Sequence, residues 1–291
     1  MDGRQPASLG LGQVRSLQGV TIRRLYPPPA REVSAIYEDL DLPPTEHREG
    51  ARPYVIINTV SSVDGRTAME GKAAGIGSTT DRRTMRTLRS KADAVMVGAG
   101  TLRAEKLSLG LDPTDGVVKP LAIIVTDTGE VPLEEHLIVE GGQEVLILLS
   151  DAAPERVVER MRTLAPVMRV PADSTGGVDL QKALLALEAE NGVESLVAEG
   201  GPGLNHALIS RQLVDELFLT VAPELLGGTA DQTLTLLRGP TLPTRDRPTL
   251  DLVSIHLSGA ELFLRYTLAR TSPGSAEVSD LCKTAGGDEH R

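Results

Sequence analysis

Aromatic residues are scarce in this sequence: Phe, Trp and Tyr together make up 2% of it, and there is no Trp. A hydrophobic core must therefore be built from Leu, Val, Ile and Ala, and the 40% of apolar residues is enough for one. The same scarcity leaves no aromatic platform for single-stranded nucleic acid. A net charge of −10 without a long Lys/Arg run also disfavours a nucleic-acid partner.

Cysteine is limited to Cys282, which excludes a disulfide framework within the chain and a Cys-rich zinc site. The five histidines show no metal-ligand spacing, so no metal is expected. No run of 18 apolar residues occurs, and the first residues lack the apolar core of a secretory signal. The expectation is a cytoplasmic protein without a membrane segment.

Several short catalytic motifs are also missing. There is no G-x-S-x-G elbow and no P-loop, which disfavours hydrolases and nucleoside triphosphatases of those types. The six-residue GxGxxG fingerprint is absent as well, which disfavours a standard Rossmann domain.

The chain divides into four parts by composition. Residues 1–19 are expected to be flexible, and the polar tail 271–291 to be disordered. Residues 20–51 contain two proline clusters around a short predicted helical piece, and are interpreted as an arm packed on the main domain. Residues 52–270 form that domain.

Strand-like and helix-like stretches alternate through the main domain. Strands are predicted at 54–60, 93–101, 120–127, 144–150, 194–201 and 215–223. Helices are predicted at 79–92, 154–164, 178–192 and 203–213, with Thr79, Thr80 or Asp81 capping the first and Gly192 ending the third. Residues 250–268 read as an antiparallel hairpin that turns at Ser258, Gly259 and Ala260. The pattern predicts an α/β sandwich with a mixed, mostly parallel sheet and a C-terminal hairpin.

The stretch "LVAEGGPGLNHALI" (196–209) ends a predicted buried strand in Glu199, Gly200 and Gly201 and starts a helix at Pro202. Paired glycines let a ligand approach the backbone, and a helix N-terminus suits a pyrophosphate. A tight turn without any ligand is an equal alternative from spacing alone. Glu199 favours a ligand, because a carboxylate at a buried strand end is costly unless it binds something.

A second glycine loop, "VGAGTLRAE" (97–105), repeats this arrangement with Gly98, Gly100 and Thr101. Thr101 can either cap the helix or donate its hydroxyl to a phosphate. Two such loops in one sheet fit a dinucleotide that lies across neighbouring strand ends.

A third stretch, 58–78, runs from a buried strand through Asp64 and Gly65 into a polar, glycine-rich segment long enough to fold over a site. Asp64 can position a ligand. It can equally form an Asx-type turn with Gly65, and that interpretation is slightly favoured.

Four stretches together resemble the reductase domain of the bifunctional riboflavin-biosynthesis deaminase-reductase family, which shares the dihydrofolate reductase fold. They read "RPYVIINTVSSVDGRTA" (52–68), "LRSKADAVMVGAGTLRAE" (88–105), "PLAIIVTD" (120–127) and "LVAEGGPGLNHALISRQLVDELFLTVAPELLGG" (196–228). The arm and the "GAGTLRAE" wording are most similar to a stand-alone subgroup. The family's deaminase half carries H-x-E and P-C-x-x-C signatures, and neither occurs here.

The resemblance implies NADPH-dependent hydride transfer to C1 of the opened ribosylamino group of a pyrimidine 5′-phosphate, in a homodimer. It implies catalytic roles for Glu105 and Glu199, and a cis bond at Gly200–Gly201. The residues that it places against substrate are Arg89, Leu109, Glu199 and Asp64. The residues that it places against NADPH are Thr59, Val60, Gly98, Thr101, Glu105, Thr126, Gly200, Gly201, Pro202, Gly203, Leu204 and Asn205.

The sequence departs from the family around the substrate phosphate. Glu105 stands where the family has Asp, and the position of the phosphate-binding Arg falls near Asp112, an acid that cannot bind a phosphate. The candidates to replace that Arg are Arg82, Arg83, Arg103 and Lys106. Gly75 lies near the place of the family's Trp.

The expected function is therefore reduction of 5-amino-6-(5-phosphoribosylamino)uracil with NADPH. Two alternatives stay open: a dihydrofolate reductase-like activity on a pteridine, and a non-catalytic NADPH-binding module.

Overall fold

The computed structural model describes residues 21–43, 52–69, 75–105, 109–111, 119–132, 142–229 and 233–269. The predicted flexible N-terminus 1–19 and the predicted tail 271–291 lie outside these ranges, as do Lys106, Asp112 and Cys282.

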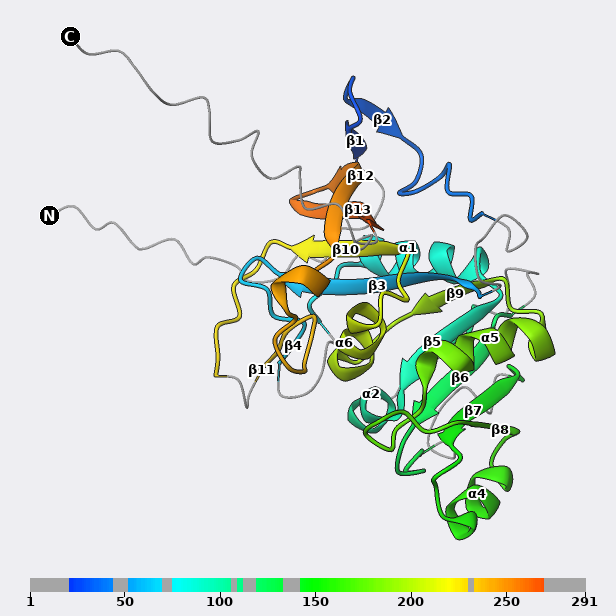
Figure 1. Ribbon diagram of the computed structural model, residues 1–291. Helices are drawn as coiled ribbons and strands as arrows, with labels where there is room; N and C mark the ends of the chain where they lie inside the picture. The colour runs from blue at the N-terminus through cyan, green and yellow to red at the C-terminus, as the bar shows by residue number, and fades with distance from the viewer. Residues whose placement is uncertain are drawn as a thin grey trace, which may run out of the picture.

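An eleven-stranded sheet runs through the whole molecule in the order β2-β1-β12-β13-β10-β3-β9-β5-β6-β7-β8 (Figure 1). The strands from β10 to β8 are parallel, and the remaining pairs are antiparallel. Their bounds are β1 Ile22–Tyr26, β2 Arg31–Val33, β3 Tyr54–Ser62, β5 Ala94–Gly98, β6 Leu121–Thr126, β7 Val145–Ser150, β8 Val167–Val170, β9 Ser195–Ala198, β10 Glu216–Ala222, β12 Thr249–Ser258 and β13 Glu261–Ala269. A small separate sheet pairs β4 (Ala68–Met69) with β11 (Thr233–Leu234).

Helices cover both faces of the parallel part. They are α1 Thr79–Ser90, α2 Ala99–Ala104, α4 Glu155–Arg162, α5 Leu180–Asn191 and α6 Pro202–Ser210, with a 3₁₀ turn, η4, at Thr244–Asp246. Val55 and Ile57 of β3 face the core under α5 and α6, and Ile56 faces the opposite core with Leu88 of α1. These three strand residues are fully buried, which explains why the central strands read as continuous apolar runs.

Most of the predicted elements are confirmed. Gly192 ends α5 in the left-handed conformation, Pro202 begins α6, and β12 and β13 form the predicted antiparallel hairpin. A mixed, mostly parallel sheet with helices on both faces is the predicted dihydrofolate reductase-like fold. None of the helices in the described ranges is long and apolar enough to cross a membrane.

The sequence named possible caps for two helices, and the structure has neither. Ser78, not Thr79, Thr80 or Asp81, caps α1, because its hydroxyl accepts from the backbone N–H groups of Thr80 and Asp81. The helix α2 begins at Ala99, directly after Gly98, so Thr101 lies inside the first turn and caps nothing.

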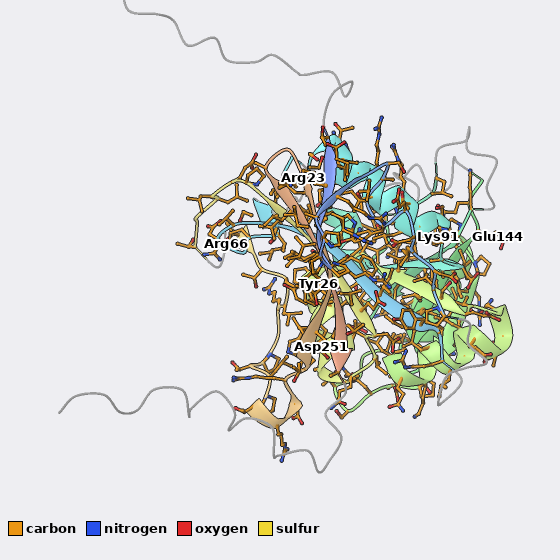
Figure 2. All side chains as sticks on the ribbon, turned by 90° about the horizontal axis from the view of Figure 1, so that it is seen from above. Arg23, Tyr26, Arg66, Lys91, Glu144 and Asp251 are labelled. Atoms are coloured by element: carbon orange, nitrogen blue, oxygen red, sulfur yellow. The ribbon has the colours of Figure 1, made fainter. Side chains whose placement is uncertain are left out.

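The arm differs most from its prediction. Residues 21–43 contain no helix and instead form β1 and β2, which extend the antiparallel edge of the sheet next to β12. Figure 2 shows Arg23 and Tyr26 on this blue strand, near the hairpin that carries Asp251. After β2, Tyr37 is buried edge-on against Phe218, with ring centroids 4.9 Å apart. The arm therefore closes the part of the core under α1.

Candidate functional site

A cavity of about 690 Å³ opens where the parallel strands β5 and β9 end and beside the C-terminal half of β3. Strand ends of this kind are where open α/β sheets bind ligands. Most of the predicted site residues line the cavity, namely Thr59, Val60, Arg89, Gly98, Thr101, Glu105, Glu199, Gly200, Gly201, Pro202, Gly203, Leu204 and Asn205.

The two glycine loops contact each other and form one wall of this cavity. The Gly98 N–H donates to the Gly200 carbonyl oxygen at 2.8 Å, and the Gly200–Gly201 bond is cis, as the resemblance implies. A Cβ at residue 201 would lie 2.6 Å from Thr101 Oγ1, which is closer than a carbon can approach. An alanine at 201 would require the Thr101 side chain to move, so the backbone after β9 and the Thr101 hydroxyl of α2 lie in close contact.

The N-terminus of α6 adds polar groups to the same wall. Gly201 is its N-cap and offers no side chain, so the first-turn N–H groups receive no side-chain cap. Asn205 is buried, and its amide donates to the Leu236 carbonyl at 3.3 Å, while Oδ1 has no hydrogen-bond partner among the described residues. Free N–H donors at a helix N-terminus and an unpaired amide oxygen suit a phosphate-containing ligand that also carries N–H donors.

A buried ion pair joins α1 to the end of β9. Arg89 Nε and Nη2 lie 2.7 and 2.6 Å from the two carboxylate oxygens of Glu199. The side chains are only 3% and 9% exposed, and Arg89 also donates to the Gly110 carbonyl at 3.0 Å. A bidentate pair with this little exposure holds Glu199 as a fixed anion at the cavity wall.

Asp81 is one of the cavity residues that sequence reasoning missed. It lines the cavity with Met85 and Arg89, at spacings of four residues along one face of α1. Burial raises the pKa of the Asp81 carboxyl to about 6, against a hydrogen bond from Thr220 that lowers it. The spacing of residues 81, 85 and 89 was a usable signal, but a helix-capping role was the simpler interpretation of an acid in the first turn.

Three of the predicted residues do not line the cavity. Asp64 is exposed and accepts from the Ser62 hydroxyl and from the backbone N–H groups of Leu226 and Gly227, so it fastens one loop to another. Leu109 is fully buried in the core between the sheet, α2 and α4. Thr126 is buried and accepts from the Gly129 N–H at the end of β6. Each has a structural role that the sequence pattern could not distinguish from ligand binding.

The cations that line the described part of the cavity are Arg82, Arg89 and Arg238. Arg82 was a predicted candidate for the phosphate site, whereas Arg238 was not. Its backbone N–H donates to the Pro202 carbonyl at 3.0 Å, which holds the loop after β11 against the start of α6. Arg83 does not line the cavity, and Arg103 donates to the Glu130 carbonyl outside it.

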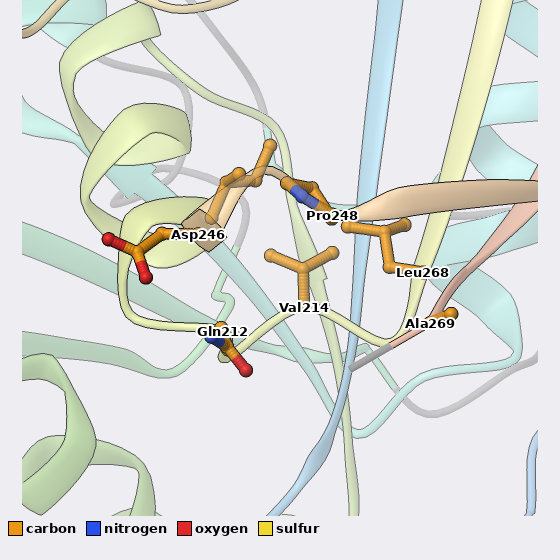
Figure 3. Close-up of a pocket in the computed structure, with 7 residues that line it drawn as sticks. Gln212, Val214, Asp246, Pro248, Leu268 and Ala269 are labelled. Carbon is orange, nitrogen blue, oxygen red and sulfur yellow. The ribbon is translucent and has the colours of Figure 1, made fainter. Parts of the chain in front are cut away.

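A second hollow lies between the end of α6, η4 and the end of β13 (Figure 3). Its volume is about 10 Å³, with Val214, Pro248 and Leu268 among its lining residues. That is room for a single water molecule at most, so it offers no ligand site.

Comparison with known proteins agrees with this geometry. Residues 53–264 match the RibD C-terminal domain family. The 2,5-diamino-6-ribosylamino-4(3H)-pyrimidinone 5′-phosphate reductase of Methanothermobacter thermautotrophicus is 31% identical over 219 residues, which are 75% of this chain and 99% of that protein. The riboflavin biosynthesis protein RibD of Bacillus amyloliquefaciens is 30% identical over 178 residues, 61% of this chain and 47% of its own length.

The fold agrees as well. A solved structure of RibD from Acinetobacter baumannii superposes with a TM-score of 0.63 at 23% identity, over 76% of this chain and 59% of that one. The chain therefore spans about half the length of the RibD proteins it matches and nearly all of the stand-alone reductase. The resemblance seen in the four sequence stretches is confirmed, and this chain belongs to the RibD C-terminal domain family.

Proposed function

We propose that this chain is an NADPH-dependent reductase of riboflavin biosynthesis that reduces the ribosylamino group of a pyrimidine 5′-phosphate. One observation carries the proposal: a single cavity joins the two glycine loops to the buried pair of Arg89 and Glu199. The names of the relatives support it, because the stand-alone relative is a pyrimidine 5′-phosphate reductase.

The cofactor would be held by the glycine-loop wall. Gly98, Gly200 and Gly201 leave the backbone open to a pyrophosphate, and the α6 N-terminus supplies N–H donors. Thr101 Oγ1 lies at the contact of the two loops and can donate to a phosphate oxygen. When bound, the nicotinamide supplies a hydride, which is the chemistry that side chains cannot provide.

The two predicted catalytic acids would have different tasks. The opened ribosylamino group has a C1=N double bond. Its reduction adds a hydride to C1 and a proton to the nitrogen, and the nitrogen carries a positive charge if it is protonated before the hydride arrives. Glu199 would orient the reacting group and not exchange its proton, because Arg89 donates to both of its oxygens and offsets its charge. Glu105 lines the same cavity and is half-buried at the end of α2, where it can exchange the proton.

Phosphate binding would fall to Arg82 and Arg238. Both are exposed cations on the cavity wall, on α1 and on the loop after β11. They replace the Arg that the family has near position 112. A homodimer remains an expectation from the family resemblance.

Turnover with defined substrates tests this function. The chain is supplied with NADPH and, separately, with phosphoribosylaminouracil, its 2-amino pyrimidinone precursor and dihydrofolate, and oxidation of NADPH is followed by absorbance. We expect turnover of at least one pyrimidine 5′-phosphate and none of dihydrofolate. Turnover of dihydrofolate alone would replace this function by the pteridine alternative, and NADPH binding without any turnover would indicate a non-catalytic module.

A further inference from the structure

Asp81 is a cavity carboxylate for which the proposed chemistry has no use. It lies in the first turn of α1, and its Oδ2 packs so closely over Gly77 that a Cβ there would collide with it. The Thr220 hydroxyl, from β10, donates to the carboxylate. Within the described ranges it forms no ion pair, unlike Glu199 on the same cavity wall.

Helix capping does not explain this carboxylate. In a capping box, the acid three residues after the cap would accept from the backbone N–H of the cap residue. Here the Ser78 N–H donates to Glu261 Oε1 at 3.1 Å, and the Ser78 hydroxyl donates to Glu261 Oε2. Glu261, from the start of β13, therefore takes over that task and leaves Asp81 directed at the cavity.

The chemistry of the site indicates what this carboxylate binds. An anion repels the phosphate of the substrate, so its partner must offer N–H or O–H donors. A 2-amino-4(3H)-pyrimidinone presents two adjacent donors, the 2-amino group and N3–H, which match the two oxygens of a carboxylate. A uracil presents a carbonyl oxygen in place of the 2-amino group, and that oxygen faces a carboxylate oxygen unfavourably.

We propose that Asp81 is the specificity-determining residue of the substrate site: it accepts from the 2-amino and N3–H groups, and the chain prefers the 2-amino pyrimidinone to the uracil. The proposal rests on the proposed reductase function and assigns to Asp81 the choice between its two pyrimidine substrates; the stand-alone relative is itself named for the 2-amino pyrimidinone. It places the chain before, rather than after, the hydrolytic deamination that converts the 2-amino group to a carbonyl.

The protonation of Asp81 fits this role. Its pKa is raised to about 6 by burial and by the charges of Glu261 and Glu199, against Arg82 and the Thr220 hydrogen bond. The carboxylate is therefore mostly ionised at neutral pH and becomes a carboxylic acid below that value. The acid offers one donor and one acceptor, which match the uracil edge instead. The preference for the 2-amino substrate should decline as pH falls through about 6.

The test is the ratio of kcat/KM for the two substrates, measured with NADPH on the same preparation, so that the folded fraction cancels. We expect the native chain to favour the 2-amino pyrimidinone roughly 10- to 100-fold, the range that one matched bidentate contact provides. In Asp81→Asn, the amide N–H can donate to the uracil carbonyl oxygen and the amide oxygen can accept from N3–H. This variant should therefore prefer the uracil. The exposed Asp251→Asn, on β12, is the matched control and should leave the ratio unchanged.

A second variant tests the geometry without removing the charge. Gly77→Ala pushes the Asp81 carboxylate from its position and should lower the ratio toward one. The proposal would be overturned if the native chain preferred the uracil, or if Asp81→Asn lowered kcat/KM equally for both substrates. The second result would assign Asp81 to the ribose hydroxyls, which both substrates share. Absence of turnover with either substrate would instead count against the proposed reductase function.

Discussion

Arg89 and Glu199 are 110 residues apart in the sequence, yet they form the most buried ion pair at the described cavity wall. Glu199→Ala would leave the Arg89 guanidinium buried without its carboxylate partner. We expect the free energy of unfolding to fall by about 3–5 kcal/mol, because an uncompensated buried charge is strongly destabilising. Urea denaturation measures this, and turnover should be lost as well.

The exposed pair of Glu155 and Arg169 provides the control. Glu155 is 56% exposed, so Glu155→Ala should cost less than about 1 kcal/mol. Replacing both buried partners by Leu and Met should recover much of the stability but none of the activity. Equal losses for Glu199→Ala and Glu155→Ala would show that burial does not set the strength of this pair.

Asp81 should make the stability of the ligand-free protein depend on pH. Its folded pKa of about 6 lies above the ordinary value of 3.8, so the folded state binds the proton more tightly than the unfolded state. The resulting stabilisation is full below pH 3.8 and is lost as the pH rises through about 6. Asp81→Asn should therefore be more stable than the native chain at pH 7, by roughly 3 kcal/mol, and equal to it in acid. Thermal unfolding across this pH range would contradict the assignment if the difference were constant.

Gly201 is the residue at which the two glycine loops meet. In Gly201→Ala the new methyl group would lie 2.6 Å from Thr101 Oγ1 and would displace the Thr101 side chain from the contact between the loops. We expect the Kd for NADPH to rise on the order of tenfold, since overpacking typically costs 1–3 kcal/mol. Gly203→Ala adds the same group to α6 where nothing lies within 4 Å, and should lose less affinity in the same titration.

At the scale of elements, the arm is expected to be part of the core. Tyr37 is 3% exposed and packs edge-on against Phe218 and His256, with centroid distances of 4.9 and 5.2 Å. Tyr37→Ala should lower the free energy of unfolding by about 3–5 kcal/mol, as expected for a buried aromatic truncated to a methyl group. Tyr26→Ala, on the same arm, removes a ring that is 39% exposed and should cost much less. Equal denaturation midpoints for the two variants would show that the arm does not contribute to the core.

The elements differ in how well the sequence predicts them. The central strands, such as β3 and β5, are buried on both faces and therefore read as apolar runs whatever their neighbours. The arm strands β1 and β2 are short edge strands, and their conformation depends on pairing with β12, which lies more than 200 residues later in the chain. A proline-rich local pattern cannot report such a partner.

For the whole molecule, ligand binding should couple to stability. The cavity walls come from β3, α1, β5, α2, the end of β9 and α6, so a bound cofactor contacts segments from across the parallel sheet. At NADPH concentrations near 100 Kd we expect about 2.7 kcal/mol of added stability, measured as a rise in Tm. NADH at the same concentration should raise the Tm less, because it lacks the 2′-phosphate. If NADPH left the Tm unchanged, the proposed cofactor site at the glycine-loop wall would be contradicted.

The sequence by itself determined the alternation of buried strands and helices and the two glycine loops. These features depend on local residue types, whose preferences persist in almost any surrounding. It also indicated Glu199 correctly as a residue at the cavity wall, because an acid at the end of a buried strand is unusual.

Only the tertiary structure decided what surrounds those loops. Because β9 lies between β3 and β5, Glu199 meets Arg89. Glu261 of β13 accepts from the Ser78 N–H, so Asp81 is not needed to cap α1. The tertiary structure also places Asp64, Leu109 and Thr126 away from the cavity, although their local sequence patterns resemble those of binding residues. A side chain's partner is set by strand order and helix packing, and these depend on contacts between residues far apart in the chain.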